Sequence, residues 1–486
     1  MTDPASLTPQ QKRPQILLGT FIHSKSRRQL EYLHHAAVAV DGQGMICAVV
    51  QSREGVEDPR EEVLKVMGWT DKEEEEVDVV QCREGEFFFP GFIDTHVHAS
   101  QYPNVGIFGT STLLDWLDKY TFPLESSLSD LAKARKVYTA CIRRTLAHGT
   151  TTAAYYATVD VPATNLLADL CLSLGQRAFV GRVCMDREAL CPDYYRDESH
   201  EASVQATKDT ITHMDEIDPE RRLVSPILTP RFAPACSEGA MDGLAKLQQQ
   251  RSLPVQTHIS ENKPEIELVK NMYPDSGSYA AVYDRCGLLT PKTVLAHAVH
   301  LTEQEASLIS QRETKVSHCP CSNSSLSSGD ARVRWMWDKG IEVGLGTDMS
   351  GGYSPSVLEA ARQATLTSRH LAMQLEDEES REKCKLTVEE VLYLATRGGA
   401  ICLGLGDTVG GFEVGKQLDA QLIRLATVGD DGFRCGEDSR EGIDAGNVDI
   451  FGWESWEEKI AKWLYNGDDR NTKKVWVRGR LVHSRR

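Results

Sequence analysis

The sequence has no apolar run that approaches the roughly 20 residues of a membrane-spanning helix. Its first residues, Met1 to Arg13, are polar and lack the apolar segment of a secretory signal. Internal repeats are absent, and the only low-complexity tract is the acid run Glu73–Glu76. We therefore expect a soluble, cytoplasmic protein without a membrane partner.

Positively charged residues are outnumbered by negatively charged ones. Lys and Arg number 54 and Asp and Glu 71, which gives a net charge of −17. A surface this acidic repels nucleic-acid phosphates, so we expect no nucleic-acid partner, whereas a small neutral substrate is unaffected. The 13 cysteines are odd in number and lack the spacing of a disulfide scaffold, which favours free thiols in a reducing compartment.

The middle of the chain alternates between short apolar runs and longer helical patterns. Runs such as Val255–His258, Val294–His297 and Ile341–Gly346 predict strands, and residues 128–148 and 302–312 predict helices. Strands that alternate with helices imply a parallel sheet, and at this length they favour an α/β fold of the (β/α)8, or TIM barrel, type. We assign this barrel to residues 89–403.

The two ends of the chain read differently, as strands broken by turns. Ile16–Val50 contains apolar groups around the turn signal Asp41–Gly44, and Asp419–Ile423 and Lys474–Gly479 also read as strands. We expect residues 14–88 and 404–486 to fold together as one small composite β-domain. Within the first part, the acidic stretch 55–77 is interpreted as a solvated, partly helical insertion.

Five residues at the ends of predicted strands indicate a metal site. His96 and His98 are two apart on one strand, so they project from the same face. His258, His297 and Asp348 each end a later apolar run. The carboxyl ends of barrel strands meet at one mouth, and imidazoles with a carboxylate suit Zn²⁺ with an open position for water.

The number of metal ions follows from a missing lysine. Binuclear barrels of this kind need a carboxylated lysine to bridge two ions, and residues 223–236, which should supply it, contain none. We therefore expect one Zn²⁺ per chain. Cys319 and Cys321 are weak alternative ligands, because two thiols in C-x-C do not by themselves close a site.

The chain resembles the guanine deaminases of the amidohydrolase superfamily from about Pro90 to its end. The resemblance is carried by segments that include the histidine pair His96 and His98, a Thr-Pro-Arg-Phe motif and a Gly-Thr-Asp motif. These segments are Pro90–Tyr102, Leu117–Pro123, Gly175–Gly181, Thr229–Phe232, His258–Asn262, Gly344–Asp348, Gly411–Lys416 and Gly467–Asn471. Two departures are Cys321, where an asparagine is expected, and the length of the insertion 55–77.

The resemblance implies a role for each candidate residue. His96, His98, His258 and Asp348 would bind zinc, and Asp348 would also take the proton of the attacking water. His297 would orient that water, and Glu261 would shuttle protons and contact the substrate. Gln101, Arg231 and Phe232 would hold the purine. The implied reaction is the hydrolysis of guanine to xanthine and ammonia by a homodimer.

The sequence leaves two alternatives open. The first is another deaminase or chlorohydrolase of the same superfamily with the same metal site. The second is a catalytically inactive barrel that serves as a scaffold, although such proteins lose metal ligands and none is missing here. The H-x-E and P-C-x-x-C pattern of the zinc deaminases that act on cytidine is absent.

Overall fold

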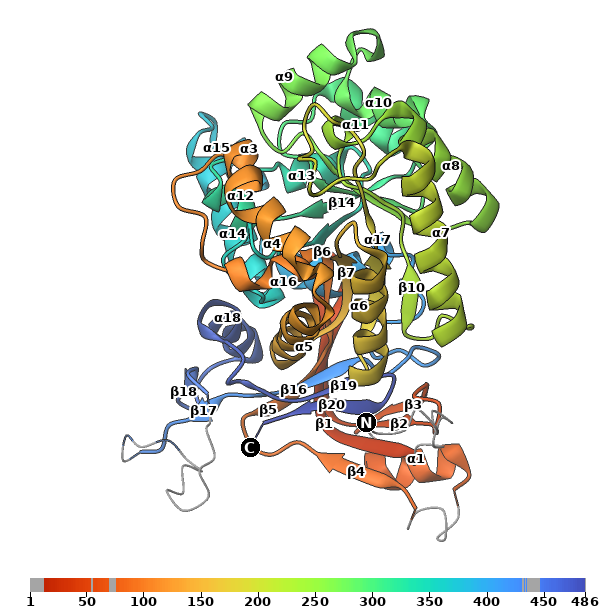
Figure 1. Ribbon diagram of the computed structural model, residues 1–486. Helices are drawn as coiled ribbons and strands as arrows, with labels where there is room; N and C mark the ends of the chain where they lie inside the picture. The colour runs from red at the N-terminus through yellow and green to blue at the C-terminus, as the bar shows by residue number, and fades with distance from the viewer. Residues whose placement is uncertain are drawn as a thin grey trace.

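The structure is a computed structural model, and it describes residues 13–53, 56–69, 76–430, 432, 434 and 446–485. A barrel of parallel strands occupies the upper part of Figure 1, and a second sheet with both termini lies below it. Among the described residues, no helix combines the length and the apolar character needed to cross a bilayer. All cysteines in the described part of the chain are free thiols.

Eight successive positions in the barrel are filled by short parallel strands. They are β6 (Phe92–His98), β7 (Thr150–Tyr156), β8 (Arg177–Gly181), β10 (Val224–Pro226), β12 (Val255–Ile259), β13 (Thr293–His297), β14 (Lys315–His318) and β15 (Val343–Leu345). Strands β6, β7, β8 and β10 pair in parallel, as do β12 to β15, and a bridge between Leu228 and Val255 joins the two groups. Short extensions, β9 (Val183–Cys184) and β11 (Thr229–Pro230), pair beyond β8 and β10.

The barrel closes between its first and last strands. The hydroxyl of Thr95 in β6 donates to the carbonyl of Leu345 in β15 at 2.8 Å. Just beyond β15, the backbone N–H of Asp348 donates to the carbonyl of His96 at 2.9 Å. The predicted (β/α)8 fold is confirmed.

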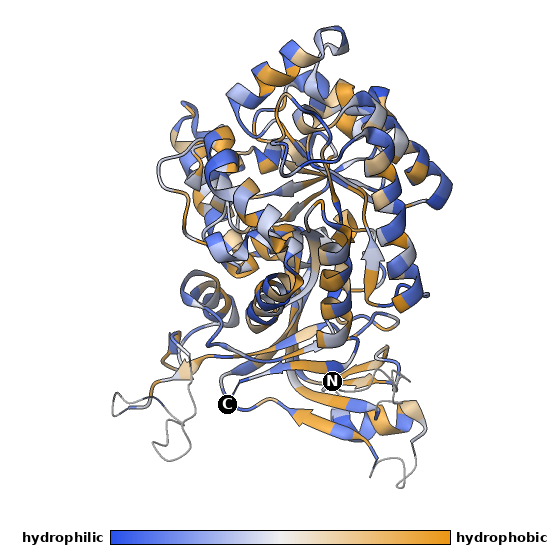
Figure 2. Cartoon of the chain, in the orientation of Figure 1, coloured by the Kyte–Doolittle hydropathy of each residue, from blue (hydrophilic) through white to orange (hydrophobic). Residues whose placement is uncertain are grey.

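Helices follow the strands and cover the outside of the barrel. They are α5 (Leu131–Ala147), α6 (Val161–Leu174), α7 (His200–Ile217), α8 (Glu238–Arg251), α9 (Lys263–Met272), α10 (Tyr279–Arg285), α11 (Glu303–Gln311), α13 (Val333–Asp338), α14 (Val357–Met373), α15 (Glu378–Cys384), α16 (Val388–Tyr393) and α17 (Gly399–Cys402). Asp130 caps α5 by accepting from the N–H groups of Ala132 and Lys133, which fixes where this helix begins. Outer helices such as α8 carry hydrophilic residues toward solvent (Figure 2).

Both ends of the chain contribute strands to the second sheet. In spatial order these strands are β20 (Arg480–Ser484), β19 (Thr472–Val477), β16 (Ala420–Arg424), β5 (Glu86–Pro90), β1 (Gln15–Ser26), β2 (Gln29–Val40) and β3 (Ile46–Gln51), and β4 (Asp78–Gln81) also pairs with β1. The junction between the two ends is the antiparallel pair of β5 and β16. Strands from both chain ends therefore share one sheet, and their folding as a separate composite β-domain stays a prediction. The exact domain boundaries at 88/89 and 403/404 stay a prediction.

The helical part of the predicted insertion is α1 (Pro59–Met67), which begins after the cap Asp58 and buries Val63. Most of the acid run, Glu73–Glu75, lies outside the described residues. Near the C-terminus, β17 (Ala426–Thr427) pairs with β18 (Asp449–Ile450), and the amphipathic helix α18 (Trp456–Asn466) buries Trp463.

A buried ion pair fastens the barrel to the second sheet at the end opposite the barrel mouth. Arg177, the first residue of β8, donates to Asp419 at 3.0 Å, and their side chains are only 6% and 1% exposed. Arg177 also donates to Gln417 at 2.7 Å, and the backbone N–H of Arg478 donates to Asp419 at 2.8 Å. Asp419 therefore receives bonds from the barrel and from the residue that follows β19.

We predict that Asp419→Asn lowers the free energy of unfolding by about 3–5 kcal/mol, because it leaves the buried guanidinium of Arg177 without its counter-charge. Denaturant unfolding of the purified variant measures this loss. Asp338→Asn is the control, since its ion pair with Lys383 is largely exposed and such pairs contribute about 0–1 kcal/mol. Equal effects of the two substitutions would contradict the prediction.

Candidate active site

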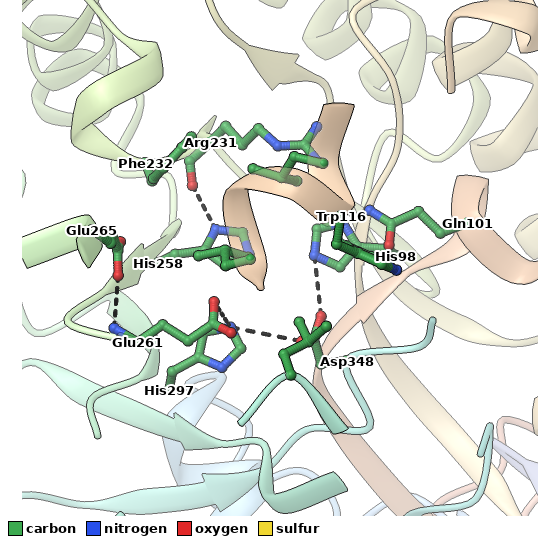
Figure 3. Close-up of a pocket in the computed structure, with 13 residues that line it drawn as sticks. His98, Gln101, Trp116, Arg231, Phe232, His258, Glu261, Glu265, His297 and Asp348 are labelled. Carbon is green, nitrogen blue, oxygen red and sulfur yellow. Dashed lines mark hydrogen bonds and ion pairs between the residues drawn. The ribbon is translucent and has the colours of Figure 1, made fainter. Parts of the chain in front are cut away.

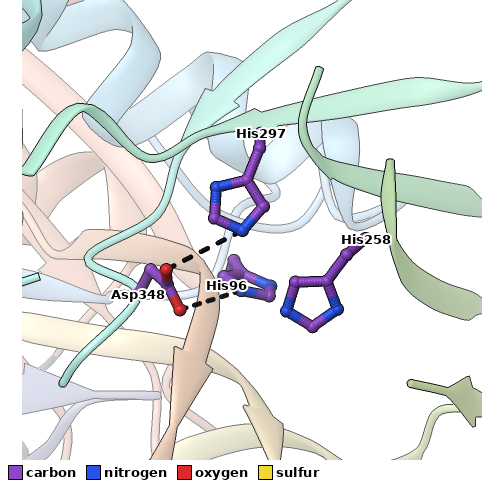
Figure 4. Close-up of side chains that lie close together, drawn as sticks. All are labelled: His96, His258, His297 and Asp348. Carbon is purple, nitrogen blue, oxygen red and sulfur yellow. Dashed lines mark hydrogen bonds and ion pairs between the residues drawn. The ribbon is translucent and has the colours of Figure 1, made fainter. Parts of the chain in front are cut away.

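Five side chains converge at the mouth of the barrel. His96, His258, His297 and Asp348 each offer one ligand atom, and these atoms lie within 4.8 Å of one another (Figure 4). The Nε2 atom of His96 is 3.1 Å from Oδ1 of Asp348, and Nε2 of His98 is 3.3 Å from the same oxygen. His297 Nε2 is 3.7 Å from the other oxygen, Oδ2. The compact group of four includes His297 rather than His98, and His98 lies immediately beside it.

The hydrogen bond of the His258 ring directs a lone pair inward, and the His297 ring is held by a similar contact. Nδ1 of His258 is 2.6 Å from the carbonyl oxygen of Arg231, which can only accept, so Nδ1 carries the proton and Nε2 is left bare. Nδ1 of His297 is 2.9 Å from Oδ1 of Asn323, and its Nε2 is buried without a hydrogen-bond partner. This arrangement of a second ring nitrogen held by an acceptor is typical of metal-binding histidines.

The charge states also suit a cation. Burial lowers the pKa of His96, and lowers those of His98 and His258 well below the usual range, so these imidazoles are neutral. Burial opposes ionisation of Asp348, but the neighbouring histidines hold its pKa well below the ordinary value, so it is a carboxylate. Neutral imidazole nitrogens with one carboxylate form the donor set that Zn²⁺ prefers, and the residues present therefore fit a bound metal.

The backbone at the mouth adopts uncommon conformations. His297 has φ of 72° and Asp348 has φ of 44°, in the left-handed region that residues with a side chain rarely occupy. Ser260 and Ala298, beside the same strand ends, have φ of 48° and 50°. Such residues persist only where the surroundings hold them, and they cluster at functional sites.

A pocket opens directly onto four of the five converging side chains. Figure 3 shows His98, His258, His297, Glu261 and Asp348 around its centre. Its other walls come from the βα loops and from the segment α3 (Leu113–Trp116). They include Gln101, Leu113, Trp116, Leu117, Arg231, Phe232, Glu265 and Leu326. All the residues proposed from the sequence thus lie in one place, and His96 is the one that does not line the pocket itself.

Glu261 is wholly buried in this pocket. One carboxylate oxygen accepts from the hydroxyl of Ser328 at 2.9 Å, and the other is 3.5 Å from Nε2 of His297. Burial raises the pKa of Glu261 to about 7, so a substantial fraction of this group is protonated near neutral pH. A carboxyl group in this state can either donate or accept a proton, as general acid–base catalysis requires.

Glu265 holds Glu261 in position, and its role was not predicted from the sequence. Its carboxylate accepts from the backbone N–H of Glu261 at 2.8 Å and from the hydroxyl of Tyr279 at 2.8 Å. It forms a capping box with Asn262 at the start of α9. The spacing Asn262-x-x-Glu265 was the available signal, because this pattern marks a helix start.

Arg231 is not a free cation, because the carboxylate of Glu125 accompanies it. Nη1 of Arg231 donates to Glu125 at 2.7 Å, and Nη2 donates to the other carboxylate oxygen at 3.4 Å. Both side chains are buried, and the guanidinium lies over the ring of Phe122. Sequence reasoning missed Glu125, since a lone glutamate after the Leu117–Pro123 segment carries no spacing that links it to Arg231.

Cys321, where the resemblance led us to expect asparagine, is buried in α12 (Pro320–Ser325). Neither it nor Cys319 belongs to the metal-capable group found among the described residues. Burial raises the pKa of both thiols, which disfavours the thiolate form that binds metals.

Comparison with known proteins agrees with this geometry. The model of the amidohydrolase family matches residues 87–482, which is most of the chain. The chain belongs to the amidohydrolase family. The matched residues of this chain include every strand of the barrel and every residue that lines the pocket.

Relatives of this amidohydrolase are guanine deaminases. A probable guanine deaminase of Schizosaccharomyces pombe is 45% identical over 96% of this chain and 83% of its own length. The guanine deaminase of Homo sapiens is 41% identical over 96% of both chains. A guanine deaminase structure from C. acetobutylicum with guanine bound in its active site covers 97% of this chain and 100% of its own, with a TM-score of 0.81 and 32% identity.

We predict that the purified protein contains one divalent metal ion per chain, measured by elemental analysis. His98→Ala should lower the metal content, because it removes a neutral imidazole 3.3 Å from the carboxylate of Asp348. His213→Ala is the control, since His213 lies on α7 and pairs with Asp169 outside the pocket. Two ions per chain, or full metal content in His98→Ala, would contradict this prediction.

Proposed function

We propose that the protein is a guanine deaminase that hydrolyses guanine to xanthine and ammonia. The observation that carries this proposal is the pocket, in which a metal-capable group faces Glu261, Gln101 and Arg231 in a single buried site. It is supported by relatives that carry this activity in their names and align with 96% of the chain. The reaction breaks the bond between C2 and the exocyclic nitrogen and forms a bond from C2 to the water oxygen.

The proposed cofactor is one Zn²⁺ per chain, held by His96, His98, His258 and Asp348. The choice of zinc over other divalent ions follows from the nitrogen-rich donor set. Bound zinc supplies the Lewis acidity that makes water a nucleophile near neutral pH. The absence of lysine from residues 223–236 supports one ion rather than two.

Asp348 and Glu261 transfer protons in the proposed reaction, and His297 orients the attacking water. Asp348 is ionised and takes the proton of the attacking water, which His297 orients. Glu261 gives a proton to N3 of guanine as water attacks C2, and its burial keeps that proton available. Asp348 then passes the water proton to the exocyclic nitrogen, so that ammonia leaves. Glu261, now ionised, takes the remaining hydroxyl proton as the C2 carbonyl of xanthine forms.

Substrate recognition is assigned to the groups on the pocket wall. A guanidinium carries five N–H groups, and Arg231 uses two of them to donate to Glu125. The remaining N–H groups of Arg231 donate to the C6 carbonyl of guanine. Phe232 provides an aromatic wall for the ring, and Trp116 is a further aromatic residue of the pocket. Gln101 contacts the edge of the purine.

Three further properties belong to the same proposal; the first rests on the family resemblance, and the other two rest on the pattern of the sequence. They are a homodimeric assembly, a cytoplasmic location, and two domains that divide at 88/89 and 403/404. The alternative of an inactive scaffold is disfavoured because the metal-capable group and Glu261 are both in place. Another deaminase or chlorohydrolase of the family remains the second candidate, and the substrate panel below separates it from guanine deaminase.

Guanine is predicted to be deaminated far faster than adenine or cytosine. The N–H groups of Arg231 cannot pair with the amino group of adenine, and buried donors left unpaired reject a ligand by up to about 10⁴–10⁵-fold. Ammonia release over a panel of purines and pyrimidines, with guanosine included, measures the preference. The guanine assignment fails if adenine or cytosine reacts as fast as guanine, and the family assignment then remains.

Glu261→Gln should reduce turnover of guanine by about 10²–10⁴-fold, because the amide keeps the shape but has no acidic proton to transfer. The metal content should stay at the wild-type value. Glu305→Gln is the matched control, because Glu305 is an equally buried glutamate in the capping box of α11, away from the pocket. Loss of metal from Glu261→Gln would show instead that Glu261 is structural.

A further inference from the structure

Glu125 is the centre of a buried network behind the pocket wall. It lies in α4 (Phe122–Ser126), and its side chain is 0% exposed. Besides the two bonds from Arg231, its carboxylate accepts from the hydroxyl of Tyr195 at 2.7 Å, from Nε2 of Gln101 at 2.7 Å and from the hydroxyl of Ser100 at 3.3 Å. Two of these donors, Arg231 and Gln101, also line the pocket.

The first consequence concerns the amide of Gln101. A carboxylate accepts hydrogen bonds and cannot donate them, so only the NH₂ end of the amide can face Glu125. The oxygen Oε1 therefore lies on the other side of the amide, where it is buried and without a hydrogen-bond partner among the described residues. A buried acceptor left unpaired is unfavourable, and a ligand N–H in the pocket would satisfy it.

The second consequence concerns the charge of Arg231. A guanidinium alone on a pocket wall is a site for carboxylates and phosphates. Nη1 and Nη2 of Arg231 both donate to the carboxylate of Glu125, at 2.7 and 3.4 Å, and a guanidinium stays protonated in proteins. The pair as a whole is neutral, and Arg231 therefore presents hydrogen-bond donors to the pocket without a net charge.

We propose that Glu125 is a positioning residue that sets the specificity of the pocket for a neutral ring. It fixes Gln101 with its acceptor toward the ligand and cancels the charge of Arg231, so that the pocket matches a lactam, which offers a carbonyl beside an N–H. Anionic purines are excluded by the same residue. This inference deepens the proposed function and rests on it.

The decisive variant is Glu125→Gln. Its amide still accepts from Arg231, but its NH₂ group now meets the NH₂ of Gln101, so Gln101 turns its own NH₂ toward the pocket. The variant also leaves the charge of Arg231 uncancelled. The KM for guanine should rise about 10–100-fold with a smaller change in kcat. The inhibition constant of purine-6-carboxylate should fall about tenfold or more.

A rise in the KM for guanine together with a fall in the inhibition constant of purine-6-carboxylate distinguishes a positioning role of Glu125 from a purely structural one. Loss of a structural contact would weaken the binding of guanine and of purine-6-carboxylate alike. Glu125→Asp keeps the negative charge and should keep the exclusion of purine-6-carboxylate. Asp419→Asn is the matched control, since it also removes the carboxylate from a buried arginine pair, but outside the pocket. Asp419→Asn should leave the ratio of the KM for guanine to the inhibition constant of purine-6-carboxylate unchanged.

Metal content and melting temperature are measured for every variant, so that a misfolded protein is recognised. If Glu125→Gln does not fold, Gln101→Leu tests the same network. It should raise the KM for guanine without improving the binding of purine-6-carboxylate, because Glu125 still pairs with Arg231. Equal weakening of both ligands by Glu125→Gln, or tighter purine-6-carboxylate binding by Gln101→Leu, would overturn the inference. Metal-loaded wild-type protein that does not deaminate guanine would instead refute the proposed function.

Discussion

The carboxylate of Asp94 ties the first strand of the barrel to the last. It accepts from the backbone N–H of Thr347 at 3.0 Å and from its hydroxyl at 2.5 Å, and it also accepts from the N–H of His96 at 3.2 Å. Thr347 immediately precedes Asp348. The bonds that close the barrel therefore also hold Asp348 beside His96, and a different register of closure would separate them.

Buried charge in this molecule is compensated in two ways that serve different parts of the site. Asp348 is surrounded by imidazoles, and together they form a donor set that suits a cation. Arg231 has its counter-ion, Glu125, within the protein. The first arrangement favours binding of a charged species, and the second removes charge from the surface that the substrate meets. The same pocket can therefore combine an electrostatically strong reaction centre with recognition by neutral hydrogen bonds.

The sequence predicted those parts of the site that depend on local periodicity. His96 and His98 were found because a two-residue spacing on a strand fixes a common face, and His258 and Asp348 because strand ends converge in a barrel. Glu125 was not found, because its pairing with Arg231 depends on how the α4 segment packs over the residues that follow β11. Spacing in the sequence describes neighbours within an element, whereas loop packing is decided by the whole fold.

The pairing of β5 with β16 has a consequence for the folding of this chain. Pro90 and Gln421, which a side-chain hydrogen bond joins across this pair, are 331 positions apart. During synthesis, β5 therefore leaves the ribosome long before its antiparallel partner exists, and the whole barrel must be made in between. Contacts of such long range slow folding and leave an apolar strand edge open to other chains. The aromatic strand Glu86–Pro90 is therefore an aggregation hazard in the nascent chain, because one of its edges stays unpaired until β16 has been made.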